Sequence, residues 1–148
     1  MGRVQNSVRI DRPISEVFAY VVDPSNTPRW NSTVLASTSS DASVRVGTTI
    51  RSRVRFLFRE REIEAKVIAL EPHSRLVTES LQPYRYTLTW TFAPEDGGTR
   101  VTRTGNIEFR GILRVISPLV IRPIARRTDQ ASLERMKAEL ERRGRSLD

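Results

Sequence analysis

The amino-acid sequence predicts an α+β protein in which a curved antiparallel sheet of about seven strands wraps around a long C-terminal helix, with two short helices after the first strand. Three observations lead to this prediction. The chain opens with a strand followed by a helix, residues 33–109 alternate with the period of strands, and the residues after Gly111 follow a helical period to about Arg143.

The opening strand is residues 3–10, RVQNSVRI. Val4, Val8 and Ile10 share one face with Asn6, and the intervening residues are polar or basic. This alternation is typical of a strand with one buried face.

A helix is predicted next, beginning near Pro13, because proline favours the first helical position. The apolar residues that follow have helical spacing: Ile14, Val17, Phe18 and Val21. The stretch DPSNTPRW, residues 23–30, then interrupts the helix and ends on Trp30, one of two tryptophans.

Six further stretches alternate and predict strands. They are residues 32–39, 48–56, 59–70, 75–81, 84–94 and 99–109. Short turns between them, such as EDGG at residues 95–98, imply antiparallel pairing. The one-sided alternation implies that one face of the sheet is exposed to solvent and that the other is covered by the C-terminal helix.

The segment that leads into this helix, residues 110–127, carries five arginines and no acidic residue. Pro118 and Pro123 predict that the regular helix begins only near Pro123. Its buried stripe is then expected to contain Ala125, Leu133, Met136 and Leu140. The arginine-rich segment either covers the entrance of a cavity with its apolar side, which is the favoured reading, or binds an anionic membrane or RNA.

Composition limits the class of protein. The 148 residues suit one domain, residues 1–148, and the absence of cysteine excludes disulfides, thiolate zinc sites and cysteine nucleophiles. The first ten residues lack the apolar stretch of a secretory signal, and no apolar run approaches the length of a membrane span. We therefore expect a cytoplasmic protein, either a monomer or a homodimer.

The formal net charge is +8, from 25 basic and 17 acidic residues. Such a charge attracts nucleic acid, anionic lipid or acidic ligands, but it does not by itself identify a partner. Nucleic acid is the least favoured partner, and peripheral contact with an anionic membrane is retained as an alternative.

The order of elements resembles the START-like superfamily, also called SRPBCC or the polyketide cyclase/dehydrase and lipid transport group, which has the helix-grip fold. The resemblance covers essentially the whole chain. It is carried by the opening strand and by the motifs RPISEVFAYVVDPSNTPRW, ALEPHSRLV, LTWTFAPEDGGTRVT and SLERMKAELE.

This resemblance implies a cavity between the sheet and the C-terminal helix that binds an apolar or aromatic small molecule, such as a lipid or a polyketide-like compound. The protein would act as a carrier or sensor, or as a cyclase or dehydratase, and no cofactor is implied. The residues expected to line the cavity are Trp30, Ile50, Val54, Phe56, Tyr84, Tyr86, Trp90, Arg103, Phe109, Leu119, Ile124 and Thr128. Trp30 is open to two readings, as a wall of the cavity or as a plug in the core between the helices.

Polar residues among apolar neighbours are the candidates for chemistry. Arg103 shares the parity of Val101 and Ile107. Glu79 is assigned to the same inner face, although the pattern fits the opposite face of its strand almost as well as the inner one. A buried charge needs a partner, so we expect an Arg103–Glu79 pair, either structural or acting on a ligand carbonyl. Gly105, on the face of Arg103, leaves room for a ligand or marks a bulge.

Conventional catalytic motifs are missing from the sequence. His73 is the only histidine, and it stands in the predicted EPHS turn. No spacing of His, Asp and Glu residues indicates a metal site, so none is expected. Arg103 and Glu79 are therefore the candidate catalytic residues if the protein is an enzyme.

Overall fold

The computed structural model describes residues 2–56, 58–82, 85–108, 111, 115 and 117–147. The predicted ligand contacts Tyr84 and Phe109, and the side chain of Phe56, lie outside the described part.

The order of elements follows the prediction. The elements are β1 (Gly2–Ile10), α1 (Ile14–Val22), the short 3-10 helix η1 (Pro24–Asn26), α2 (Thr27–Trp30), β2 (Val34–Ser39), β3 (Thr49–Phe56), β4 (Arg59–Glu71), β5 (Arg75–Ser80), β6 (Tyr86–Glu95), β7 (Gly98–Ile107), the π-helical turn η2 (Ser117–Ile121) and α4 (Arg122–Leu147).

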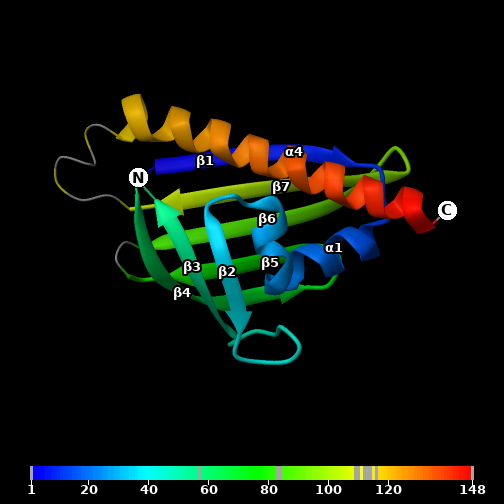
Figure 1. The fold of residues 1–148 in the computed structure, drawn as a ribbon, viewed down its shortest axis with the longest axis horizontal. Helices are drawn as coiled ribbons and strands as arrows, with labels where there is room; N and C mark the ends of the chain where they lie inside the picture. Colours follow the sequence, from blue (N-terminus) through cyan, green and yellow to red (C-terminus); the bar gives the residue numbers. More distant parts are fainter. Residues whose placement is uncertain are drawn as a thin grey trace.

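The seven strands form one antiparallel sheet in the order β1-β7-β6-β5-β4-β3-β2. Each strand from β2 onward pairs with its successor in the chain, and β1 pairs with the last strand, β7. Figure 1 shows the sheet curling beneath α4, which runs along β1, while α1 lies below the C-terminal half of the helix. This arrangement is the helix-grip α+β fold that the sequence predicts.

The local sequence explains α1 and the turn after it. Pro13 stands just before the helix, one position earlier than expected, and Val17, Phe18 and Val21 are buried. The Asp23 carboxylate accepts a hydrogen bond from the Ser25 backbone N–H at 3.0 Å, which caps η1. The chain thereby turns before Trp30.

The long helix α4 begins at Arg122, next to Pro123, as predicted. Its stripe of Leu133, Met136 and Leu140 is completely or almost completely buried, which confirms the predicted side of the helix. Asn6 holds the first half of the helix to β1. The Asn6 amide donates to the Arg126 carbonyl at 3.1 Å and to the Gln130 side chain at 3.0 Å.

The hydrophobic core lies between α1, α2 and the C-terminal half of α4 on one side and the sheet on the other. Its members include Ile10, Phe18, Trp30, Trp90, Phe92, Val101 and Leu133. In the part of the chain that the structure describes, no helix is both long enough and apolar enough to cross a membrane.

Candidate ligand-binding site on the inner face of the sheet

The inner face is the side of the sheet that carries Trp90 and faces the helices. The strand register defines it, because Trp90 lies opposite Leu76 on β5 and Arg103 on β7, and Arg103 lies opposite Asn6 on β1. Period-two alternation then extends the face across the other strands.

Burial divides the inner face into two parts. Around Trp90, the side chains of Val8, Phe92 and Val101 are buried in the core. Elsewhere on β3 to β6, where inward Val67, Leu76 and Ser80 are also buried and inward Arg61 is exposed, several inward side chains are only half-buried. We call these residues the open part of the inner face: Ile50, Ser52, Val54, Ile63, Thr78, Tyr86 and Leu88.

The open part is mainly apolar, with a few hydroxyl groups. The Ser52 hydroxyl lies 2.9 Å from that of Ser37 on β2, and Thr78 and Tyr86 contribute further hydroxyls. An apolar surface with a few polar groups that orient a ligand is typical of small-molecule sites. Ile50, Val54 and Tyr86, all expected to line the cavity, lie on this surface.

A buried ion pair stands beside the open part. Arg103 Nη1 lies 2.7 Å from Asp129 Oδ2 on α4, and the two side chains are 10% and 23% exposed. The guanidinium carbon also lies 5.5 Å from the centroid of the Trp90 ring, in a cation–π contact. The prediction that Arg103 faces inward and needs an anionic partner is confirmed.

The predicted partner of Arg103 was wrong. Glu79 lies opposite Thr87 and Lys66, on the outer face, whereas Leu76, Thr78 and Ser80 of the same strand face inward. The sequence was ambiguous because Val77, on the outer face, is as apolar as Leu76 and is also buried. Glu79 and Arg103 therefore point to opposite sides of the sheet.

Asp129 is the residue that sequence reasoning missed. A signal for it was present, because Asp129 falls four residues before Leu133 and four after Ala125, on the predicted buried stripe of the helix. An acidic residue on that stripe has to find a cationic partner on the sheet, and Arg103 is in reach.

Trp30 takes a place in the core. It is 4% exposed and contacts the Trp90 ring edge-to-face, with ring centroids 5.4 Å apart. Of the two readings of Trp30, a plug in the core between the helices agrees with its burial, and Trp90 is equally buried beside it.

Three other expected lining residues lie on the surface. Leu119 and Ile124 are 80% and 59% exposed, and Thr128 is also exposed, so the expectation that they line the inner space was wrong. For Ile124 and Thr128, the reason is the rotation of α4. Asn6 holds Gln130 toward β1, and a helix turns by about 100° per residue, which points Ile124 and Thr128 away from the sheet.

The space above Gly105 is taken by Tyr86. A Cβ atom on Gly105 would lie 2.9 Å from the Tyr86 hydroxyl oxygen, so the tyrosine ring lies against the glycine backbone. Gly105 thus makes room for a side chain of the neighbouring strand, where the sequence had suggested a ligand or a bulge. Tyr86, held in this way, is positioned at the border of the open part.

Among the hollows on the described surface, two lie outside the space between the sheet and the inward side of α4. One, of about 350 Å³, is lined by β2–β4 residues that include Ser39, Thr49 and Glu64. The other, of about 270 Å³, is lined by Pro118, Arg122, Pro123, Arg126 and Arg127.

The inner face offers little conventional catalytic chemistry. Among the described residues, no group of three or more His, Cys, Asp or Glu side chains could hold a metal ion. His73 is exposed in its turn, with a positive φ of 62°, and its ring stands edge-to-face with the Phe18 ring, with centroids 5.6 Å apart. Arg103 and Asp129 thus form an ion pair on the inner face, next to Trp90.

These features define a class of protein: a helix-grip domain with an apolar inner face. The family model for polyketide cyclase/dehydrase and lipid transport proteins matches residues 1–141. The chain belongs to this family, which suggests a hydrophobic small-molecule ligand or a polyketide cyclase activity.

Solved structures agree on the fold. The chain is similar to TTHA0849 from Thermus thermophilus, with 18% identity, a TM-score of 0.79, and 94% and 97% of the two chains covered. It is also similar to DR_A0006 from Deinococcus radiodurans, with 20% identity, a TM-score of 0.68, and coverage of 93% and 96%. The di-domain ARO/CYC StfQ of the steffimycin biosynthetic pathway shares 12% identity at a TM-score of 0.76, over 96% of this chain and 51% of that one. The comparison with curated protein sequences gave no match.

Proposed function

We propose that this protein binds an apolar or aromatic small molecule, lipid-like or polyketide-like, on the open part of the inner face, as a carrier or sensor. The observation that carries the proposal is the partial exposure of side chains such as Ile50, Tyr86 and Leu88, which point toward the helices. Apolar side chains on the concave side of a sheet are normally covered by other side chains of the core. Apolar side chains that are left partly uncovered therefore favour a bound ligand.

The neighbouring groups support a ligand with a polar end. The hydroxyls of Ser52, Thr78 and Tyr86 can donate to or accept from a carbonyl or hydroxyl group. The remaining surface, formed by aliphatic side chains, favours an apolar body.

The first test is native mass spectrometry of the protein purified from its own host, followed by denaturing extraction of any bound compound. A stoichiometric apolar compound supports the proposal, and its structure names the ligand class. If the purified protein carries no compound, the result contradicts a permanently bound ligand, and only a transiently bound ligand remains compatible with the proposal.

A pair of variants on one strand localises the ligand. Leu88→Trp fills the open part of the inner face, whereas Thr91→Trp places the same ring on the exposed outer side of β6. We expect Leu88→Trp to lose the co-purifying compound and Thr91→Trp to keep it. Equal retention by both variants would place the compound elsewhere on the molecule.

Catalysis is the second candidate, and the Arg103–Asp129 pair is the observation that favours it. A guanidinium next to the inner space can polarise a ligand carbonyl, and the carboxylate can accept a proton. The test incubates the protein with a linear poly-β-ketone and measures cyclised or dehydrated products. Turnover that Asp129→Asn abolishes while ligand binding persists supports an enzyme, and absence of turnover in the unaltered protein supports a carrier.

A further inference from the structure

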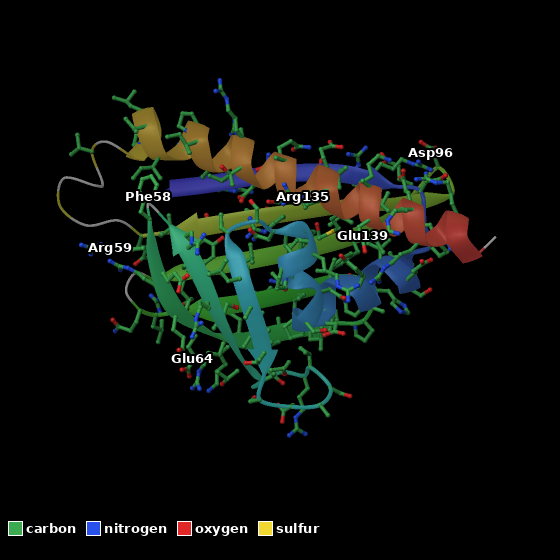
Figure 2. The ribbon with its side chains drawn as sticks, viewed as in Figure 1. Phe58, Arg59, Glu64, Asp96, Arg135 and Glu139 are labelled. Atoms are coloured by element: carbon green, nitrogen blue, oxygen red, sulfur yellow. The ribbon has the colours of Figure 1, made fainter. Side chains whose placement is uncertain are left out.

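One end of the molecule, where α4 begins, combines exposed apolar side chains with arginines. We call it the basic rim and define it by six residues: Phe58, Leu119, Arg122, Ile124, Arg126 and Arg127. Figure 2 shows Phe58 at the end of the molecule where α4 starts, with Asp96 at the opposite end. The rim therefore combines the tip of the β3–β4 hairpin with the start of the helix, which lie at the same end of the molecule.

The apolar members of the rim are unusually exposed. Phe58 is 102% exposed at the tip of its hairpin, where its backbone has a positive φ of 65°. A bulky residue seldom adopts this conformation, and here it stands on a protruding turn. Leu119 and Ile124 are the other exposed apolar members, as described above. Exposed apolar groups that gather at one end indicate an interaction surface, whereas single ones need no explanation.

The charged members of the basic rim are all arginines. Arg122, Arg126 and Arg127 surround the hollow of about 270 Å³ between Pro118 and Pro123. Within the described part of the chain, Arg126 and Arg127 form no ion pair, and Arg122 donates only to the Arg3 carbonyl at 3.2 Å. Glu60, beside the hairpin tip, is neutralised by Arg55 at 3.1 Å.

We propose that the basic rim docks this protein on the surface of an anionic lipid bilayer. The arginines would contact lipid phosphates, and Phe58, Leu119 and Ile124 would enter the headgroup region. Charge complementarity selects anionic lipid, and the exposed apolar side chains distinguish a bilayer from a purely polar polyanion. Membrane docking does not depend on the proposed ligand binding. Docking would, however, bring Tyr86, the first residue of β6 at this end, close to the bilayer.

The experiment measures co-flotation of the purified protein with vesicles of phosphatidylcholine, alone or with about one third phosphatidylglycerol. We expect binding to the anionic vesicles only, and release when salt rises from about 0.1 M to about 1 M, which shortens the Debye length from about 10 to about 3 Å. The triple variant R122Q/R126Q/R127Q should weaken binding about a hundredfold, at about fivefold for each arginine.

A matched variant controls for net charge. The variant R45Q/R53Q/R75Q also removes three positive charges, but from exposed positions outside the rim. The binding of this variant should stay within about twofold of that of the unaltered protein. A second variant, F58S/L119S/I124S, should weaken binding at least about tenfold, because three apolar anchors are lost. Circular dichroism confirms that each variant is folded, as expected for surface changes.

Several results would overturn the proposal. Equal weakening by both arginine variants would mean diffuse attraction by net charge. Unchanged binding by F58S/L119S/I124S would remove the bilayer as the partner. Tighter binding to a single-stranded RNA than to the anionic vesicles, or a stable dimer that buries the rim in light scattering, would assign the surface to a different occupant.

Discussion

Arg103 on β7 and Asp129 on α4 form an ion pair of 2.7 Å across the boundary between sheet and helix, with the Trp90 ring beneath the guanidinium. The pair joins the long helix to β7, the strand next to the edge strand β1, beside the Trp90 ring of the buried core. The orientation of α4 and the shape of the inner space therefore both depend on this contact.

Asp129→Ala should destabilise the protein. The change leaves the Arg103 guanidinium largely buried without its carboxylate, and the loss of one partner of a buried pair costs about 3 kcal/mol. In a chain of this length, that corresponds to a fall in Tm of about 6 to 12 °C. Urea unfolding followed by the fluorescence of Trp30 and Trp90 measures the free energy of unfolding.

Two controls accompany this measurement. The double variant R103M/D129L replaces the pair by apolar groups of similar size and should recover most of the lost stability. Glu64→Ala breaks an exposed contact with Arg51 at 3.4 Å and should cost less than about 1 kcal/mol. If Asp129→Ala costs no more than Glu64→Ala, the Arg103–Asp129 pair does not hold helix and sheet together.

Truncation to alanine at two leucines of the C-terminal region should change stability by very different amounts. Leu133→Ala removes a fully buried side chain of α4 and should cost about 2 to 5 kcal/mol. Leu119→Ala acts on a side chain that is mostly in solvent, so stability should change by less than about 0.5 kcal/mol. Thermal unfolding of both variants checks the prediction. A large loss in Leu119→Ala would mean that η2 packs on the sheet after all.

Tyr20 should make the protein less stable at alkaline pH. Burial raises the pKa of the Tyr20 hydroxyl above its usual value near 10; the Glu139 carboxylate adds to the rise, while Arg143 and Arg29 oppose it. The unfolded chain then loses this proton at a lower pH than the folded chain. The free energy of unfolding therefore falls as pH rises from about 10 through the folded pKa.

Urea unfolding from about pH 8 to about pH 11, compared between the unaltered protein and Tyr20→Phe, measures this effect. The variant should lose less stability over the alkaline range. At neutral pH it should be as stable as the unaltered protein or more so, because the buried hydroxyl has no hydrogen-bond partner among the described residues. An identical alkaline slope in both proteins would show that Tyr20 is not responsible.

Several features of the fold were readable from local sequence because they depend on local chemistry. Alternation around Trp90 identified β6 and its buried face, and the prolines at 118 and 123 located the start of α4. The stripe from Leu133 to Leu140 identified the side of the helix that packs on the sheet. The inward direction of Arg103 followed from the same period-two rule.

The candidate site was less predictable, because it depends on which surfaces meet. Glu79 was assigned to the inner face because β5 is apolar on both sides, and only pairing with β4 and β6 decides its direction. Leu119 and Ile124 were expected to line the cavity, because an amphipathic pattern shows that one side of a helix is apolar but not what covers that side. Asp129 was overlooked although its position on the buried stripe was visible.

The sequence by itself determined the order of strands and helices, the direction of Arg103 and the buried stripe of α4, since these follow from the periods of 2 and 3.6 residues and from proline and turn chemistry. The tertiary structure alone decided that Asp129 is the partner of Arg103, that Tyr86 occupies the space over Gly105, and that Leu119 and Ile124 face outward. The physical reason is that these relationships join elements far apart in the chain. They depend on strand register and helix rotation, which many weak contacts set together and no short stretch of sequence encodes.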